Sequence, residues 1–176
     1  IPLAIDLDNI RFNELDYESG KLVVFHGVMC GREAFKGSDY ILKAFEYISE
    51  KYPNDVECII SKNMPYDEYL RFVKNAHVLM DQTNGISYGM GALIGLAQGK
   101  IVCCSSQDPR FLKKWLNMRD ENKLPPIIPI LPDYQQIVSQ LEWVLDNRKK
   151  LPKMAAKGRS YVEKHHDSKK IAQQFL

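Results

Sequence analysis

Short, mainly apolar runs alternate along the chain with segments whose apolar positions recur at helical spacing. The runs cover residues 22–25, 56–60, 77–80 and 101–104 and are rich in residues that favour strands. Such runs are typical of strands that are buried on both faces of a parallel sheet. The segments between them carry the apolar stripes of helices. This alternation predicts an α/β protein with a Rossmann-like open parallel sheet flanked by helices.

The predicted helices have recognisable start signals. Ser38 is a suitable N-cap for the first long helix, which should end before Pro53. Pro65 and Asp67 are expected to start the second. The third, over residues 88–98, is apolar nearly all round and should therefore be buried.

The C-terminal part of the chain adds further elements. Residues 108–115 are predicted to form a short helix, and residues 127–130 a fifth strand that nearby prolines confine to a sheet edge. Asp133 is expected to cap a strong helix. Two more helices are predicted over residues 152–166 and 168–175. These extra C-terminal helices would complete the domain.

Length and charge restrict the classes of function. The 176 residues fit one domain, and 24 basic against 22 acidic side chains give a net charge of only +2. This balance creates no long-range field for nucleic acid, which we do not expect as a partner. No stretch is long and apolar enough for a membrane span, and no signal peptide is visible.

The cysteines point to a reducing compartment. Cys58, Cys103 and Cys104 lie in predicted strands, where they behave as small buried hydrophobes. We therefore expect a cytoplasmic protein. The chain begins at Ile1 rather than Met, and we interpret it as a piece of a larger protein.

In open parallel sheets, ligands bind beyond the carboxyl ends of the strands. This rule selects four loops before any motif is considered. They cover residues 27–36, 61–66, 81–91 and 105–110.

A glycine-rich turn, residues 85–91, lies in the third of these loops. Glycines let a ligand approach the backbone closely, and the free amides of a first helical turn attract anions. The predicted phosphate contacts are Ser87, Tyr88, Gly89 and Met90. The alternative is that the glycines only allow close packing of the helix on the sheet.

Two cations follow the first strand. Arg32 and Lys36 are close enough in sequence to converge on one anion, since Arg offers a planar fork and Lys a mobile charge. The alternative is a solvated loop with two unrelated cations. Because this loop and the glycine turn lie at the same rim of the sheet, each strengthens the phosphate hypothesis for the other.

Other polar residues stand at the ends of predicted strands. The predicted base-binding segment is Ser61, Lys62, Asn63 and Met64, although an ordinary strand-to-helix turn would look the same. Candidate sugar or ribose contacts are His26, Asp81 and Gln82, each of which also suits a purely structural role.

Catalytic chemistry is not marked in the sequence. No triad, zinc set or paired carboxylates stands out, so the catalytic residues are unknown and no metal site or cofactor is predicted. His165 and His166 lie in a polar helix, and we expect both on the surface.

From about Lys21 onward, the segments resemble the C-terminal domain of the retaining group 1 glycosyltransferases with the GT-B fold. Residues 31–37 resemble the family's Gly-Arg…Lys-Gly stretch, and residues 75–80 resemble the strand that precedes its Pro-Ser. Residues 87–102 resemble its S-F-G-L-x-x-L-E-A-M-A-x-G-K-P-V segment, and residues 158–172 its terminal helices. The pieces occur in the family's order.

This resemblance implies a nucleotide-sugar-binding domain, one half of a GT-B fold. Residues 21–176 would form that domain, and residues 1–20 would lead in from a missing N-terminal, acceptor-binding domain. Arg32 and Lys36 would neutralise the diphosphate of a nucleotide diphosphate sugar, the donor substrate, and the enzyme would be a hexosyltransferase of polysaccharide biosynthesis. The fragment alone would be inactive. The resemblance leaves open peripheral membrane association through the missing half.

The sequence departs from the family at the glycine turn. The family has two glutamates separated by seven residues, and Ile86 and Ile94 occupy those positions here. Asp81-Gln82 replaces the family's Pro-Ser. The alternative is therefore a degenerate GT-B domain that binds a nucleotide or a partner without catalysis. An NAD-binding Rossmann domain is disfavoured, because no G-x-G-x-x-G follows the first strand.

Overall fold

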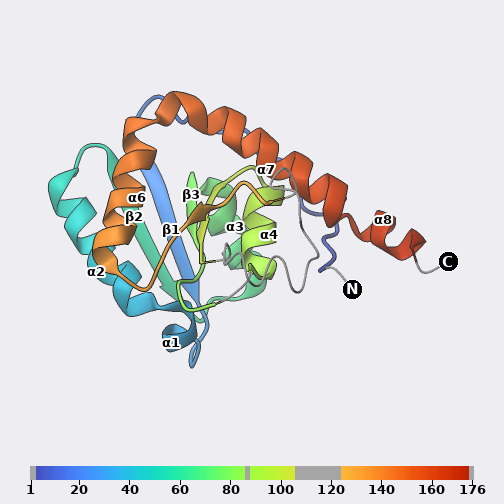
Figure 1. Cartoon of the computed structure of the whole chain (residues 1–176), viewed down its shortest axis with the longest axis horizontal. Coiled ribbons are helices and arrows are strands. Elements are labelled where there is room, and N and C mark those ends of the chain that lie inside the picture. The colour runs from blue at the N-terminus through green and yellow to red at the C-terminus, as the bar shows by residue number, and fades with distance from the viewer. Residues whose placement is uncertain (1–2, 86–87, 106–123, 175–176) are drawn as a thin grey trace.

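The computed structural model, which describes residues 3–85, 88–105 and 124–174, contains one parallel sheet with strand order β2-β1-β3-β4-β5 (Figure 1). The strands are β1 (Leu22–Val28), β2 (Val56–Lys62), β3 (Val78–Met80), β4 (Ile101–Cys104) and β5 (Ile128–Pro129). This arrangement confirms the predicted Rossmann-like α/β class. The parallel pairing requires a crossover between successive strands, and helices make the crossovers that the structure describes.

Helices cover both faces of the sheet. They are α1 (Glu33–Lys36), α2 (Ser38–Lys51), α3 (Tyr66–Asn75), α4 (Met90–Ala97), α6 (Tyr134–Asp146), the 3-10 helix η2 (Arg148–Lys150), α7 (Leu151–His165) and α8 (Ser168–Gln173). On one face α2 packs against α6, and on the other α4 packs against α7, with α8 beyond it (Figure 1). The helix predicted over residues 108–115 lies outside the described residues.

The alternation of side chains along β1 builds two hydrophobic cores. Leu22 and Val24 point to the face of α2 and α6, whereas Phe25 points to the face of α3 and α4. All three are buried. β1 is therefore apolar on both faces, as its continuous apolar run predicted.

Several element ends differ from the prediction. β1 and β2 are longer than predicted, because their pairing continues with Gly27 opposite Ser61 and Val28 opposite Lys62. Ser38 is the first residue of α2 rather than its N-cap, which is Gly37 with φ 65°. A left-handed backbone of this kind favours glycine.

In the C-terminal half, the proline positions and the helix-cap residue predicted the structure correctly. β5 lies at the edge of the sheet, where its prolines predicted it. The Asp133 side chain caps α6 by accepting a hydrogen bond from the Gln135 backbone amide.

The lead-in segment folds onto the domain. Ile5 forms a parallel bridge with Asp167, and its backbone amide donates to the His166 carbonyl at 2.7 Å. Ile10 and Tyr17 are buried. The prediction that His166 lies on the surface is wrong: its ring is buried because the lead-in covers it, and its Nδ1 lies 2.8 Å from the Leu3 carbonyl oxygen.

Candidate nucleotide-sugar site

A cleft of about 740 Å³ opens at the carboxyl ends of β1, β2 and β3. Three of the four loops selected by the sheet rule supply most of its lining, and the fourth lies outside the described residues beyond Ser105. The lining residues are Gly27, Val28, Met29, Arg32, Phe35, Lys36, Asn63, Met64, Tyr66, Tyr69, Asp81, Gln82, Gly89, Met90, Gly91 and Ile94. A cleft of this size accommodates a nucleotide-sized ligand.

Both predicted cations line the cleft. Arg32 is exposed, its guanidinium carbon lies 6.0 Å from the centre of the Phe35 ring, and no described residue forms an ion pair with it. Lys36 is the last residue of α1. The structure therefore brings the two cations to one cavity, as the sequence predicted.

The loop that carries the cations is anchored to the segment after β3. The Thr83 amide donates to the Lys36 carbonyl at 2.9 Å, and the Asn84 side-chain amide donates to the Ala34 carbonyl at 2.6 Å. A Cβ added at Gly37 would collide with the Thr83 hydroxyl. This close approach holds α1 at the cleft.

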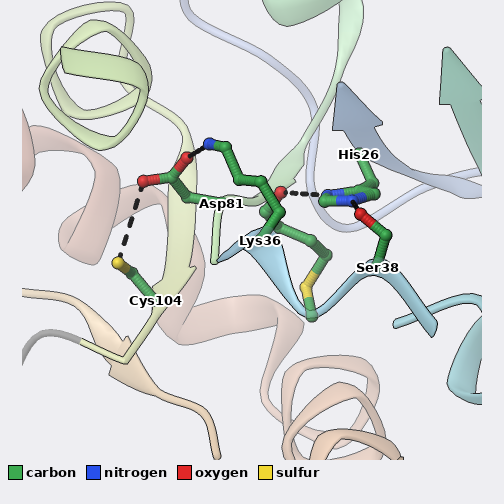
Figure 2. A network of polar contacts seen from close by, with 6 residues as sticks. His26, Lys36, Ser38, Asp81 and Cys104 are labelled. Atoms are coloured by element: carbon green, nitrogen blue, oxygen red, sulfur yellow. Dashed lines mark hydrogen bonds and ion pairs between the residues drawn. The ribbon is translucent and has the colours of Figure 1, made fainter. Parts of the chain in front are cut away.

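Lys36 forms an ion pair with Asp81 (Figure 2). The Asp81 side chain is 3% exposed and that of Lys36 20%, so the carboxylate is the deeper partner. The second carboxylate oxygen lies 3.8 Å from the Cys104 thiol, which donates to it. Asp81 thus lies in the cleft, as predicted, but its charge is already engaged.

The start of α4 forms another wall. The N-cap is Gly89, so no N-cap side chain covers the first amides of the helix. Gly89, Met90 and Gly91 all line the cleft. The first amides of a helix have no intrahelical acceptor, so they are available to an anion there. Ser87 and Ile86 lie outside the described residues.

Tyr88 behaves differently from its neighbours. Its side chain is buried away from the cleft lining, and its hydroxyl lies 2.9 Å from that of Tyr161 and 3.2 Å from Nε2 of His166. Burial raises the pKa of the Tyr88 hydroxyl, which is therefore a neutral hydrogen-bonding group. The side chain anchors the turn to α7.

The predicted base segment divides into two halves. Asn63 and Met64 line the cleft, whereas Ser61 and Lys62 belong to β2 and are not among the lining residues. Asn63 has φ 54°, and its side-chain oxygen accepts a hydrogen bond from the Cys30 amide. Asn tolerates this left-handed backbone better than most residues.

His26 lies in the interior. It has no exposed surface, its Nδ1 lies 2.9 Å from the Met80 carbonyl oxygen, and its Nε2 lies 2.8 Å from the Ser38 hydroxyl (Figure 2). Burial is the main cause that lowers its pKa, so the ring is neutral. His26 was predicted either to contact the sugar or ribose or to have a structural role, and its buried position gives it the structural role. Gln82, the third candidate, does line the cleft.

Sequence reasoning missed the apolar wall of the cleft. Tyr66 and Tyr69 lie in a segment that was predicted only to form a helix, yet both line the cavity, with Met29, Phe35 and Met90 around its rim. These rim side chains are between 43% and 72% exposed. Tyr66 and Tyr69 stand in the first turn of α3, next to a rim loop, which was the signal available.

Comparisons with solved structures identify the fold. The C-terminal domain of a group 1 family glycosyltransferase, LpcC from Francisella tularensis, matches 93% of this chain and 99% of its own at 14% identity, with a TM-score of 0.66. Anabaena HepE in complex with UDP matches 98% of this chain at 12% identity, with a TM-score of 0.67. The chain has the fold of a group 1 glycosyltransferase C-terminal domain. The resemblance noted in the sequence is confirmed at the level of the fold.

The chain corresponds to only part of some of the structures that it matches. Sucrose-phosphate synthase from Thermosynechococcus elongatus matches 99% of this chain at 15% identity, with a TM-score of 0.64. The chain spans about half of that protein, 50%, and 54% of HepE. No protein-family model and no curated protein matches the sequence. Among the described residues, no helix has the length and apolar character needed to cross a membrane.

Proposed function

We propose that this chain is the donor-binding domain of a glycosyltransferase and holds the nucleoside diphosphate of a nucleotide sugar in the cleft. The observation that carries the proposal is the convergence of Arg32, Lys36 and the N-terminus of α4 on one cavity. Two cations and free helix amides around one cavity suit an anion with two phosphates.

Within this proposal, each wall has a role. Arg32 and Lys36 neutralise the diphosphate together with the backbone amides of Gly89 and Met90. The contacts predicted for Ser87 and Tyr88 belong to the same phosphate site. Asn63 and Met64 flank the base, and the aromatic rings of α3 supply an apolar surface beside them. Asp81 and Gln82 lie where sugar hydroxyls would reach the cleft floor. The HepE structure with UDP supports a nucleotide as the ligand class for this fold.

Sugar transfer itself would need a second domain. The chain matches about half of the sucrose-phosphate synthase and HepE chains, and we propose that an N-terminal domain holds the saccharide or lipid-linked acceptor. In such an arrangement the diphosphate is the leaving group. The two cations stabilise the charge that develops on it, which is the electrostatic part of catalysis.

The first test is thermal unfolding with UDP, GDP and ADP and with their sugar conjugates. A ligand present at about 100 times its dissociation constant stabilises the folded state by roughly 2.7 kcal/mol. We expect one nucleotide series to raise the melting temperature. Absence of any shift across the three series would contradict donor binding.

The second test separates phosphate contacts from base contacts. Arg32→Ala and Lys36→Ala should each weaken a nucleoside diphosphate by about 1.5–3 kcal/mol, the scale of a charge-assisted hydrogen bond, and leave the nucleoside unaffected. Lys43→Ala, an exposed lysine on α2, is the matched control. Equal weakening of both ligands would contradict the phosphate assignment.

One observation favours a second candidate, a degenerate domain that binds a nucleotide or a partner without transfer. Ile94 lines the cleft, is 3% exposed, and offers no hydrogen bond at a position where the resembling family has a glutamate. A sugar-transfer assay on the full-length protein separates the two candidates. Donor binding with no transfer to any acceptor, and no donor hydrolysis, would favour the degenerate domain.

A further inference from the structure

The ion pair between Lys36 and Asp81 places a negative charge inside a cleft that is otherwise suited to anions. Both residues line the cavity, and Figure 2 shows the lysine reaching from α1 to the carboxylate after β3. The carboxylate is almost fully buried, while the lysine side chain retains 20% of its exposure. A ligand therefore meets the lysine first and the aspartate behind it.

The carboxylate is held in place by the sheet. The Asp81 amide donates to the Cys103 carbonyl at 2.9 Å, which continues the β3–β4 pairing. Among the described residues, its second oxygen, Oδ2, receives a weak donor, the Cys104 thiol at 3.8 Å. The Lys36 side chain has a long flexible stem and is 20% exposed, whereas that of Asp81 is 3% exposed, so we expect the lysine to move when the pair changes.

The same carboxylate touches the start of α4. A Cβ built on Gly91 would lie 2.9 Å from Oδ1 of Asp81. Gly91 is the second residue of that helix, whose free amides we assign to the diphosphate. A diphosphate in this position lies close to Asp81 and draws Lys36 away from it.

We propose that Asp81 makes the cleft distinguish an intact nucleotide sugar from the nucleoside diphosphate that remains after transfer. This inference rests on the proposed function. When a bare diphosphate takes Lys36, the buried carboxylate loses its cation and repels the nearby phosphate charge. When an intact donor binds, the sugar attached to the second phosphate brings hydroxyls beside Asp81. Those hydroxyls donate to the carboxylate and replace the lost lysine contact.

The consequence is a bias toward substrate over product. Asp81 weakens the binding of the bare nucleoside diphosphate. It does not weaken the binding of the nucleotide sugar, because the sugar hydroxyls contact the carboxylate. A different role, in which Asp81 merely positions Lys36, predicts that removing the carboxylate weakens both ligands to the same extent. The two roles therefore predict opposite changes in the affinity for the diphosphate.

The experiment measures dissociation constants of UDP and UDP-glucose by calorimetry for this chain and for Asp81→Asn. GDP with GDP-mannose and ADP with ADP-glucose are measured in the same way, so that the base does not limit the test. In the variant we expect the diphosphate to bind about tenfold more tightly, the scale of one like-charge contact at a partly hydrated site. The sugar conjugate should bind no more tightly than before, so its relative preference falls about tenfold.

Matched variants keep the test specific. Asp39→Asn removes an exposed acid from the first turn of α2, outside the cleft lining, and should leave the preference unchanged. Asp81→Ser removes the charge with a smaller side chain and should shift the preference in the same direction as Asp81→Asn. In a Lys36→Met background the unpaired carboxylate still faces the phosphate, so Asp81→Asn should again tighten diphosphate binding about tenfold.

The possible outcomes separate the proposed function from the role of Asp81. If no nucleotide binds the unmodified chain, the proposed function fails and the role of Asp81 fails with it. If nucleotides bind but the ratio of the two dissociation constants changes less than twofold in both Asp81 variants, only the role of Asp81 is overturned. Equal weakening of both ligands also overturns it and assigns Asp81 to the positioning of Lys36.

Discussion

The hydroxyl of Ser38 lies 2.8 Å from Nε2 of His26 in the interior, and this contact ties β1 to the first turn of α2. Since burial lowers the pKa of His26, the ring is neutral; Nδ1 then donates to the Met80 carbonyl and Nε2 accepts from the hydroxyl. The pair lies next to the loop that carries Arg32 and Lys36, because Ser38 follows Lys36 by two residues. Its integrity therefore bears on the position of the cleft.

Ser38→Ala should destabilise the fold by about 1–3 kcal/mol, because the substitution leaves a buried ring nitrogen without its donor. Urea denaturation of the two proteins measures the difference. Ser139→Ala on the exposed face of α6 should change stability by less than about 0.5 kcal/mol and serves as the control. Equal effects of the two substitutions would contradict the role given to the His26 contact.

Lys100 should make stability depend on pH in the alkaline range. The side chain is 1% exposed and donates to the Lys74 carbonyl at 2.6 Å, and burial lowers its pKa from 10.5 to about 7. Between these values the unfolded chain binds the proton and the folded chain does not, so stability rises with pH. Below about pH 7 both states are protonated and the penalty of the buried charge is fully present.

Lys100→Met should remove this dependence. The difference in unfolding free energy between the native chain and the variant should change by about 1 kcal/mol per pH unit from pH 7 to pH 9, in favour of the native chain. Denaturation at several pH values measures it. A parallel pair of stability curves would show that the buried amine does not titrate there.

Alanine substitutions at Gly95 and Gly89 should have different effects, the first on stability and the second on ligand binding. A Cβ on Gly95 would lie 2.7 Å from a Leu79 methyl and 2.9 Å from a Val102 methyl, whereas a Cβ on Gly89 would meet nothing within 4 Å. Gly95→Ala should therefore destabilise the fold by about 1–3 kcal/mol through overpacking. Gly89→Ala should leave stability nearly unchanged and weaken a nucleoside diphosphate, since Gly89 lines the cleft. Thermal unfolding and calorimetry, applied to both variants, test this separation of packing from ligand approach.

Tyr88 should matter for stability through its hydroxyl. Tyr88→Phe removes the buried partner of Tyr161 and His166, at a cost of about 1–3 kcal/mol for the groups left unpaired. Tyr134→Phe, on an exposed ring of α6, provides the matched loss of a hydroxyl. If the two substitutions had the same effect in denaturant titrations, the network would carry no net stability.

The sheet and its binding edge were predictable from short-range pattern. Continuous apolar runs marked β1, β3 and β4, prolines assigned β5 to an edge, and Asp133 marked the start of α6. These signals depend on the chemistry of neighbouring residues. The general rule for parallel sheets then placed Arg32 and Lys36 near the glycine turn, because the carboxyl ends of such strands share one edge.

Contacts between distant segments were not predictable in the same way. Lys36 and Asp81 are 45 residues apart, and nothing local to either shows that they pair. His166 belongs to a polar stretch, yet it is buried and its Nδ1 contacts the carbonyl oxygen of Leu3, 163 residues away. Ser61 stayed in β2 because β1 continued beside it, which neither segment indicates alone.

The sequence by itself determined the order of elements, the open parallel sheet and the rim loops, because helix and strand periodicity and cap residues act over a few positions. Tertiary structure decided which rim side chains share the cleft. His26 and Tyr88 turned into the interior, Tyr66 and Tyr69 turned toward the cavity, and Asp81 took Lys36 as its partner. Burial, charge pairing and side-chain direction depend on elements that meet only when the chain has folded.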